Sequence, residues 1–552
     1  MNDYLALKEA AEKEFQRWIA FTYDNDKFRQ KLLKLYGNDE EIVDAFYTDL
    51  NFGTSGIRGI LGPGTNRINE YVIGRATQGL ANYLNKYTEH FNSVVIAYDS
   101  REGSEYFARE TAAVLRGNGI RPFIFRELTP VSVLSYAIRY LKCTMGIMIT
   151  ASHNPKVYNG YKIYNSEGYQ VVGEEARRIM EEIELVDYFT GVRRKEDKGI
   201  LEVSNQVREN FIRDLVNSMP KYDIEQINGL KTIYTPLYGT GNKFVKAAFR
   251  TIGYKNFNEV SSQTKPDPDF PTCPVPNPER ILAYDEGFRV LEEDDADIII
   301  ATDPDADRVG AALIHDGMRT LITGNQLGIL MLDYLCHMSP PKPGQLVFKS
   351  IATSPLVNTM AEKYGFRVVN TLTGFKYIGQ QIAALDKAGH ASEYYFGFEE
   401  SNSFLASPFI REKDGISGAL LIVQMAAFHK AQGKDLIDRL NELYAELGPC
   451  QDKQRNYFFS GAEGKEKMKE IMTVFRGMKE GMLGEHKIAR MTDYQTETGL
   501  PHANVISFDF TDGSKVIIRP SGTESKLKVY SFERTEFTDV EKEIVRIIRR
   551  FE

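Results

Sequence analysis

A serine in a short polar loop is the first group in the chain that could bond covalently to a substrate. The loop reads Thr150-Ala-Ser-His-Asn-Pro155 and follows an apolar run, so we predict that it leaves the end of a strand. Ser152 would expose its hydroxyl there, with His153 beside it. Serine is a weak nucleophile without a base or an electrophile, and no G-x-S-x-G elbow is present, which disfavours an acyl-transfer triad. A lone Ser-His pair is more often a helix cap, so other motifs must decide its role.

Three aspartates alternate in a second loop, which lies between two apolar runs. Asp303, Asp305 and Asp307 would repel one another unless a cation lay between them, and their hard oxygen atoms suit Mg²⁺. The spacing also matches the start of an EF-hand loop, but no glutamate stands at the end of such a loop. A solvated acidic turn is not expected between buried strands. We therefore predict a divalent metal site, with Arg308 beside it able to bind phosphoryl oxygen atoms.

A third loop near the C-terminal end collects donors for an anion. Arg519-Pro-Ser-Gly-Thr523 offers a guanidinium, two hydroxyl groups and a glycine that permits close backbone approach. No G-x-x-x-x-G-K-[ST] motif is present, so nucleoside triphosphates are not expected as substrates. A tight turn with a helix cap would explain the proline and the glycine but not the concentration of donors. The loop is predicted to hold a phosphate group.

A fourth loop, Phe398-Glu-Glu-Ser401, is acidic. Paired carboxylates can serve as the acid and base of a glycosidase, but such an enzyme needs neither a metal nor a phosphate cradle. Hydrogen bonds from vicinal sugar hydroxyls fit the other motifs better. Lys376 and Lys413 add cations to the same part of the chain, although either alone is more often a surface residue. The four loops together predict a metal-assisted enzyme that moves a phosphoryl group on a sugar.

The elements that must position these loops are strands and helices in alternation. β-Branched runs alternate with helical periodicity over most of the chain, which predicts α/β sheets with functional loops at the strand ends. Hairpin-like strands and a terminal amphipathic helix predict a smaller α+β unit at the end. The proline-dense segment 265–278 is predicted to be an extended loop. We expect three α/β domains and one α+β domain around a central cleft, at residues 1–205, 206–317, 318–445 and 446–552.

Composition limits the partners. The 552 residues carry a formal net charge of −8, so no overall basic field attracts nucleic acid or an anionic membrane. Four scattered cysteines, Cys143, Cys273, Cys336 and Cys450, show no metal-ligand spacing and suit a reducing compartment. The N-terminus lacks the apolar core of a signal peptide, and the longest apolar stretch is too short to span a bilayer. We expect a cytoplasmic enzyme, as a monomer or weak dimer.

The motifs closely resemble those of the α-D-phosphohexomutase family, over essentially the whole chain. The branch most similar is that of the phosphoglucomutases related to phosphopentomutase. Four further segments support the likeness: Phe52-Gly-Thr-Ser-Gly-Ile-Arg58-Gly59, Tyr234-Thr-Pro-Leu-Tyr-Gly-Thr-Gly241, Phe270-Pro-Thr-Cys-Pro-Val-Pro-Asn-Pro278 and Thr373-Gly-Phe-Lys376.

The resemblance implies a heart-shaped, four-domain enzyme in which Ser152 carries the phosphoryl group as phosphoserine. That phosphate and the three aspartates would coordinate Mg²⁺. Arg58, Lys162 and Arg308 would surround the transferred group, with Lys162 as a candidate proton shuttle. The implied substrate-binding residues are Thr373, Gly374, Lys376, Glu399, Ser401 and Lys413 and, for the phosphate not being transferred, Arg519, Ser521, Gly522 and Thr523.

Some departures leave alternatives open. Lys156-Val-Tyr stands where the best-known glucose-specific relatives have a glycine pair, and Ser403 stands where phosphomannomutase-type relatives have a histidine. The second acid or base is therefore undecided between His153 and Lys413. The leading expectation is interconversion of α-D-glucose 1-phosphate and glucose 6-phosphate through glucose 1,6-bisphosphate. Pentose or mannose phosphates are the alternative substrates, and a non-catalytic sugar-phosphate sensor is the alternative from another class.

Overall fold

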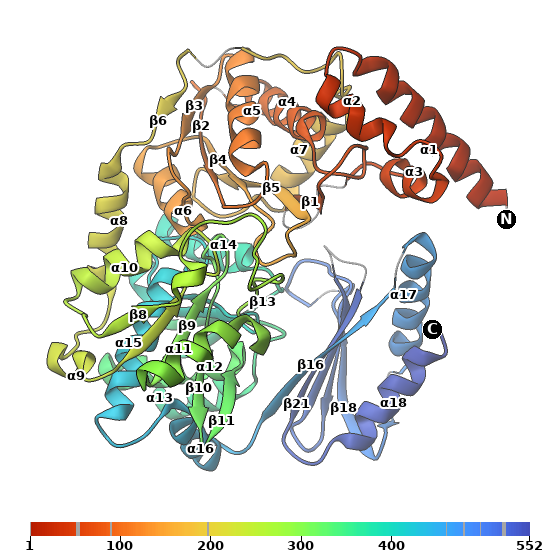
Figure 1. Cartoon of the computed structure of the whole chain (residues 1–552). Helices are drawn as coiled ribbons and strands as arrows, with labels where there is room; N and C mark the ends of the chain where they lie inside the picture. The colour runs from red at the N-terminus through yellow and green to blue at the C-terminus, as the bar shows by residue number, and fades with distance from the viewer. Residues whose placement is uncertain are drawn as a thin grey trace.

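Four sheets, one per unit, make up the computed structural model of the protein. It describes residues 2–50, 56–88, 91–195, 198–459, 461–478, 481–496, 498–521 and 526–551, without the side chains of 2–4 and 461–463. Figure 1 shows the first unit at the top, the second and third below it, and the fourth at the lower right. Three mixed α/β units and a C-terminal α+β unit confirm the predicted fold class. None of the helices in these ranges is long and apolar enough to cross a membrane.

The first unit is a six-stranded sheet with order β1-β5-β4-β2-β3-β6. In β2, Val94 and Ile96 pack into one hydrophobic cluster and Val95 and Ala97 into another, because helices cover both faces. Such a strand must be apolar along its whole length, as the sequence shows. Its strands are β1 (Ile57–Ile60), β2 (Ser93–Tyr98), β3 (Arg121–Ile124), β4 (Met145–Ile149), β5 (Tyr158–Asn165) and β6 (Leu201–Glu202). Its helices are α4 (Glu70–Tyr87), α5 (Ser104–Gly117), α6 (Val131–Tyr140) and α7 (Gly173–Glu184).

Three further helices precede this sheet and were not expected from the sequence. Trp18 is fully buried there among aromatic rings, including those of Phe28, Phe46 and Tyr71. These contacts attach the helices to the first unit through the start of α4 and the residues after α7. The helices are α1 (Asn2–Phe21), α2 (Asp26–Leu33) and α3 (Asp39–Phe46).

The second unit is a five-stranded sheet with order β11-β10-β9-β7-β8. Asp316 and Gly317 both have positive φ and close the tight hairpin between β10 and β11. Segment 265–278 contains neither helix nor strand, as expected. The strands are β7 (Thr232–Thr235), β8 (Phe257–Glu259), β9 (Ile298–Thr302), β10 (Val309–His315) and β11 (Met318–Ile322). The helices here and in the connection before β7 are α8 (Asn205–Ser218), α9 (Ile224–Asn228), α10 (Gly241–Thr251) and α11 (Asp285–Asp294).

The hairpin leads us to propose a different end for the second domain. We placed the end of the second domain at residue 317, yet β11 pairs with β10 and therefore belongs to the second sheet. An Asp-Gly pair between two strand-like runs is typical of a β-hairpin, and we overlooked it when we placed the boundary. We now propose a boundary after Ile322, while the other predicted boundaries stay predictions.

The third unit has a four-stranded sheet with order β13-β12-β14-β15. Its helix α12 starts with a capping box between Thr323 and Gln326, which satisfies backbone N–H groups at the helix start. The strands are β12 (Leu346–Ser350), β13 (Arg367–Thr371), β14 (Tyr394–Glu399) and β15 (Ser403–Leu405). The helices are α12 (Gly324–Met338), α13 (Leu356–Tyr364), α14 (Phe375–Lys387), α15 (Gly415–Lys430) and α16 (Leu436–Leu447).

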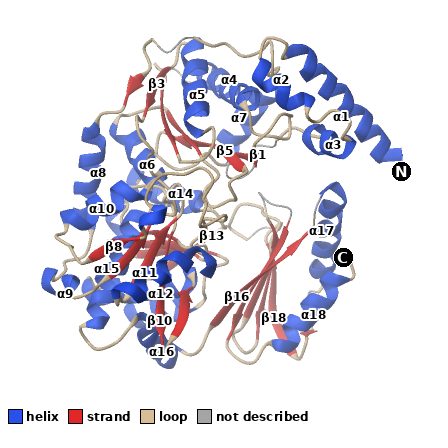
Figure 2. Ribbon diagram, in the orientation of Figure 1, coloured by secondary structure: helices blue, strands red, loops and turns tan. Residues whose placement is uncertain are grey.

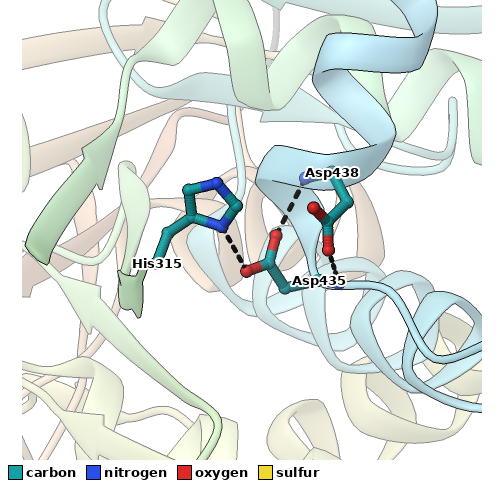
Figure 3. A group of neighbouring side chains, drawn as sticks. All are labelled: His315, Asp435 and Asp438. Carbon is teal, nitrogen blue, oxygen red and sulfur yellow. Dashed lines mark hydrogen bonds and ion pairs between the residues drawn. The ribbon is translucent and has the colours of Figure 1, made fainter. Parts of the chain in front are cut away.

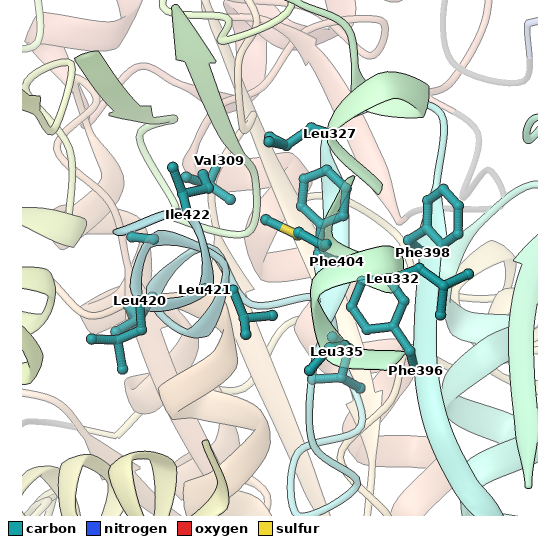
Figure 4. Packing of buried hydrophobic residues seen from close by; sticks show 14 of the residues in the cluster. Val309, Leu327, Leu332, Leu335, Phe396, Phe398, Phe404, Leu420, Leu421 and Ile422 are labelled. Carbon is teal, nitrogen blue, oxygen red and sulfur yellow. The ribbon is translucent and has the colours of Figure 1, made fainter. Parts of the chain in front are cut away.

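Helix α15 joins the second and third units through one hydrophobic core. Asp414 caps it by accepting hydrogen bonds from two backbone N–H groups, and every residue from Gly415 to Ala427 is buried. Figure 4 shows Leu420, Leu421 and Ile422 of this helix in the same cluster as Val309 of β10 and side chains of α12 and β14. A helix that is apolar all round must be covered all round. The two units therefore form one packed body.

The fourth unit is an antiparallel sheet with order β16-β21-β20-β19-β18-β17. Figure 2 shows its two helices on the same side of the sheet, and they share a hydrophobic cluster that is separate from the main core. The elements are β16 (Gln451–Phe458), α17 (Gly461–Arg476), β17 (Met482–Leu483), β18 (His486–Asp493), β19 (Ile506–Phe510), β20 (Lys515–Pro520), β21 (Lys526–Glu533) and α18 (Thr538–Arg549).

A histidine–aspartate pair links the second and third units at their surface. His315 at the end of β10 lies with its Nδ1 2.7 Å from the Asp435 carboxylate, at the start of α16 (Figure 3). Asp438 is near enough to share a cation with them. However, Asp435 and Asp438 already form the capping box of α16, so their oxygen atoms accept helix N–H groups. The hydrogen bond with Asp435 raises the pKa of His315.

This pair predicts a pH dependence of stability. A raised histidine pKa stabilises the folded protein fully below the unfolded value, and this contribution is lost as pH rises through the folded pKa. Between pH 6 and pH 8 the wild type should lose up to about 1 kcal/mol more than His315→Gln does, since the pair is partly exposed and screened. Urea unfolding of both proteins at the two pH values measures this difference. Equal losses would show that the pair contributes nothing.

Candidate active site where the four units meet

The serine loop leaves the end of β4 with its reactive side chain buried. Ser152 is only 2% exposed and has φ +52°, a conformation that is strained for a residue with a side chain. Its backbone N–H donates to Thr150 Oγ1 at 2.8 Å. Its Oγ donates to Asp303 Oδ2 at 2.8 Å and lies 3.2 Å from His153 Nδ1. The first and second units thus bring the predicted nucleophile and the predicted metal ligands together.

The three aspartates occupy the turn between β9 and β10 and are completely buried. Burial, together with the charges of Asp305 and Asp307, raises the pKa of Asp303 well above its usual range. For Asp305, burial acts in the same direction, but the charge and hydrogen bond of Lys162 outweigh it and hold the pKa below its usual value. The three carboxylates therefore depend on cations from other parts of the chain.

Two lysines from different units supply that charge. Lys162 of β5 places Nζ 2.8 Å from Asp305 Oδ2 and 3.4 Å from Asp307 Oδ2. Lys413, just before α15, places Nζ 2.9 Å from Asp307 Oδ2. We predicted Lys413 to bind substrate, and this role stays a prediction; in the structure its ammonium group contacts Asp307 and its charge also acts on Glu399 of the sugar-facing loop. It also lines the cleft.

The aspartates fit a divalent cation. One oxygen of each carboxylate lies within 4.8 Å of the others. Asp305 Oδ1 and Asp307 Oδ1 are buried without a hydrogen-bond partner among the described residues. Unsatisfied buried carboxylate oxygen atoms are costly, and a hard cation is the ligand that they would accept. Asp303, Asp305 and Asp307 are thus suitable to hold Mg²⁺.

Three further predicted residues surround Ser152. Arg58 of β1 donates to Asn154 Oδ1 at 2.7 Å. Arg308 forms an ion pair with Glu279, which the sequence analysis overlooked, and its Nε lies 3.9 Å from Asp307. Burial and the charges of Arg308 and Arg58 hold the pKa of His153 well below its usual value, so the ring is neutral near pH 7. A neutral ring can accept a hydrogen bond but is a weak base.

The acidic loop and the turn before α14 form the sugar-facing side. Gly374 has φ +123° and donates its N–H to Glu399 Oε1 at 2.6 Å, which orients that carboxylate. Burial and the neighbouring Glu400 raise the pKa of Glu399 to about 7. Ser401 Oγ lies 3.3 Å from Ser403 Oγ. Burial lowers the pKa of Lys376 to about 8, and the hydroxyl of Thr373 is buried.

The fourth unit contributes cations from β20 and β21. Arg519 donates to the Tyr530 hydroxyl at 3.3 Å, and Ser521 follows it at the edge of the cleft. Lys528, which we did not predict, faces the same space, where burial and Arg519 lower its pKa. Gly522 and Thr523 lie outside the described residues, as do the first four residues of the predicted Phe52–Gly59 segment.

One cleft of about 650 Å³ connects these groups. Its lining draws on all four units and includes most of the predicted residues, while the aspartates lie buried beneath Ser152. Glu279 and Lys528 also line it. Lys528 could have been found from the sequence, because it lies in the basic strand that follows the phosphate loop 519–523. Nothing in the sequence indicated Glu279. The predicted residues on the lining are Arg58, Ser152, His153, Lys162, Arg308, Thr373, Gly374, Lys376, Glu399, Ser401, Lys413, Arg519 and Ser521.

Comparison with known proteins shows which family this chain is similar to. Sequence models of the phosphoglucomutase/phosphomannomutase family match the chain in three consecutive ranges: α/β/α domain I at 49–188, domain II at 209–315 and domain III at 323–447. A phosphoglucomutase of Staphylococcus epidermidis is 35% identical over 529 residues, which cover 92% of this chain and 95% of that protein. One from Staphylococcus aureus strain MSSA476 is 35% identical over 532 residues, covering 93% and 94%.

The chain belongs to the phosphoglucomutase/phosphomannomutase family. The resemblance seen in the motifs is thereby confirmed, and so is the prediction of a mutase, an isomerase of carbohydrate metabolism. In fold, the chain also resembles a candidate phosphomannomutase of Thermus thermophilus, with a TM-score of 0.71 and 22% identity, over 91% of this chain and 99% of that one. The helices α1 to α3 precede the ranges matched by the phosphoglucomutase/phosphomannomutase family.

The buried aspartates predict one divalent-cation site. Titration with Mn²⁺, followed by electron paramagnetic resonance, should show one tight site per chain. Asp305→Asn should lower the affinity for Mn²⁺ at least about tenfold. Removal of a residue that only contacts a metal ligand already costs about that much, and Asp305 would itself be a ligand. Asp435→Asn is the matched control, because asparagine still caps α16 while the other potential cluster loses a charge. Weakening by the control alone would place the site at α16.

Proposed function

We propose that this protein is a phosphoglucomutase that interconverts α-D-glucose 1-phosphate and glucose 6-phosphate, with glucose 1,6-bisphosphate as intermediate and activator. One observation carries the proposal: Ser152 Oγ lies 2.8 Å from Asp303, at the base of a cleft that also holds Lys162, Arg308 and Glu399. Relatives named phosphoglucomutases, 35% identical over 92% of the chain, support this choice of substrate. We also propose sugar phosphates as its ligands, a monomer or weak dimer, and a cytoplasmic location.

In the first half-reaction, phosphoserine at position 152 would donate to the free hydroxyl of the sugar phosphate. The bond between Oγ and phosphorus breaks, a new bond forms between phosphorus and O6, the hydroxyl proton of O6 passes to a base, and Oγ receives a proton. Glucose 1,6-bisphosphate and free Ser152 result. Arg58 and Arg308 would stabilise the phosphoryl oxygen atoms, which is the main contribution in such transfers.

In the second half-reaction the bisphosphate would present its other end to Ser152. The bond between O1 and phosphorus breaks, Oγ takes the phosphoryl group, the serine proton leaves to a base, and O1 receives a proton. Glucose 6-phosphate is released and phosphoserine is restored. Arg519 and Ser521 can hold the second phosphate in either orientation, because a cradle that binds only phosphate does not read the rest of the sugar.

Asp303, Asp305, Asp307 and the Ser152 phosphate would hold the metal. A bound Mg²⁺ would supply positive charge that stabilises the phosphoryl oxygen atoms. For the proton, Lys162 and Lys413 are better placed than His153, because both reach the aspartates beneath Ser152 while the pKa of His153 is held low. We propose Lys162 as the shuttle for one half-reaction. Burial lowers the pKa of Lys413, but the charges of Asp307 and Glu412 outweigh it and raise the pKa, so we propose Lys413 as the proton donor in the other half-reaction.

The function is tested with a coupled assay on glucose, mannose, ribose and deoxyribose 1-phosphates, with Mg²⁺ and trace bisphosphate. Glucose 1-phosphate should give the highest kcat/KM. A higher kcat/KM with a pentose or mannose phosphate would show that this sugar phosphate, and not glucose 1-phosphate, is the preferred substrate. Inactivity on all four, with binding retained, would favour a sugar-phosphate sensor.

Two substitutions separate chemistry from phosphate binding. Ser152→Ala should lower kcat by at least about 10⁴-fold, as when other covalent nucleophiles are removed. Arg519→Ala should raise KM by about 10- to 100-fold, the equivalent of a lost charged hydrogen bond, with a smaller effect on kcat. Intact-mass analysis during turnover should show one phosphate on the wild type and none on Ser152→Ala. Full activity of Ser152→Ala would remove phosphoserine from the mechanism.

The raised pKa of Glu399 predicts a pH effect on substrate binding. A carboxyl group with a pKa of about 7 is mostly protonated below that pH, and it is then a poor acceptor of hydrogen bonds from sugar hydroxyl groups. The KM for glucose 1-phosphate should therefore rise by up to about tenfold from pH 8 to pH 6. Glu399→Gln should lack this component, while ionisation of the substrate phosphate affects both proteins equally. Parallel pH profiles would show that Glu399 does not control binding.

A further inference from the structure

A buried arginine lies beneath the serine loop and outside the cleft. Arg101, which follows β2, is 3% exposed. Its guanidinium donates to four backbone carbonyl groups, two of them at 2.9 and 3.1 Å. These carbonyls all belong to the serine loop or to the first residue of the following strand: Ser152, Asn154, Pro155 and Tyr158. A planar guanidinium can bind several acceptors in one plane, which an ammonium group cannot do.

The same guanidinium is tied to the start of the loop through Asp99. Asp99 Oδ2 lies 3.3 Å from Arg101 Nε and accepts the Thr150 hydroxyl at 2.6 Å. Thr150 Oγ1 in turn accepts the backbone N–H of Ser152 at 2.8 Å. The amide of Ser152 is therefore held from one side through Thr150, and its carbonyl from the other side by Arg101.

These two hydrogen bonds fix the backbone of a strained residue. Ser152 has φ +52°, and a residue with a side chain keeps such a conformation only where its surroundings enforce it. The conformation directs Oγ to Asp303 at 2.8 Å. Release of the Ser152 carbonyl would let the backbone relax and move Oγ away from the position where it must meet phosphorus.

The proline-dense segment of the second unit covers the arginine. The ring of Phe270 is fully buried and lies 5.2 Å from the Arg101 guanidinium carbon. A desolvated cation on an aromatic face is stabilised by the electrostatic attraction of the ring. The segment was predicted only as an extended loop, and this contact gives it a role beside the serine loop.

We propose that Arg101 is a positioning residue for phosphoryl transfer, which holds Ser152 in its reactive conformation under the cover of Phe270. The inference rests on the proposed role of Ser152 as phosphoserine. Arg101 does not line the cleft. Its charge acts on Asp303 and Asp305 from a distance, but its hydrogen bonds to the site run through the backbone of the serine loop.

The test compares Arg101→Met and Arg101→Lys with Arg109→Ala, an exposed arginine on α5, as control. Arg101→Met should lower kcat by about 100-fold, the cost of misplacing a reacting group by about 1 Å. Its KM should change by less than about threefold, since the groups that bind substrate are unaltered. Arg101→Lys keeps the charge opposite Asp99 but reaches fewer carbonyls, so it should recover part of kcat. The control should match the wild type.

Two further readouts separate positioning from simple loss of structure. Mn²⁺ stoichiometry should stay at the wild-type value in the variants, because the aspartate turn is intact. The rate of phosphoserine formation from glucose 1,6-bisphosphate, followed by intact mass, should fall in parallel with kcat. A fall in kcat that only matches a fall in the cation-binding fraction would overturn the proposal in favour of partial unfolding.

A folded Arg101→Met with kcat within about threefold of the wild type would also overturn the proposal, because a misplaced nucleophile costs far more. If Arg101→Met does not fold, Arg101→Lys decides: an unchanged kcat overturns the inference, and a loss of tenfold or more at constant KM supports it. Failure of the proposed function would look different. The wild type itself would then form no phosphoserine.

Discussion

Three carboxylates buried in one turn set the main constraint on this structure. Asp303, Asp305 and Asp307 have no access to solvent, and their mutual repulsion has to be offset by cations from elsewhere. Lys162 comes from the first unit and Lys413 from the third, so the turn of the second unit is stable only where the three units meet. Removing one partner of a buried charge pair is strongly destabilising. Assembly of the first three units and formation of the reactive centre are therefore the same event.

The fourth unit faces the second and third units across the cleft with charges of opposite sign. Glu279, Glu399 and Glu400 line the cleft on the side of the second and third units, while Arg519 and Lys528 line it on the side of the fourth. These groups already act on one another, since Glu400 favours the charged forms of both cations. One hydrophobic cluster unites the sheet and helices of the fourth unit, while other residues of the same sheet, such as Ile517 and Phe532, pack into the main core. A sugar phosphate placed between the two sides would bind Arg519 and Lys528 through its phosphate and Glu399 through its hydroxyl groups.

The sequence was informative wherever chemistry is confined to one short segment. Each of the four loops combines a strand end with unusual side chains, so the serine, the aspartates and Glu399 could be found without a structure. Glu279 and Arg101 could not, because their roles depend on partners that only tertiary packing brings near: Arg308 for one, and carbonyl groups some fifty residues away for the other. The N-terminal helices were missed for a similar reason, since their aromatic residues acquire meaning only against α4.

Helix α15 has a consequence for the order in which the chain becomes compact. It is apolar on nearly every side and packs against β10, which ends about a hundred residues before it, and against α10, which lies still earlier in the chain. During translation, the second sheet would leave the ribosome with an exposed apolar surface, because α15, which covers it, has not yet been synthesised. Such surfaces make nascent chains prone to aggregate. The interval before residue 430 emerges is thus the time at which this protein most needs a chaperone.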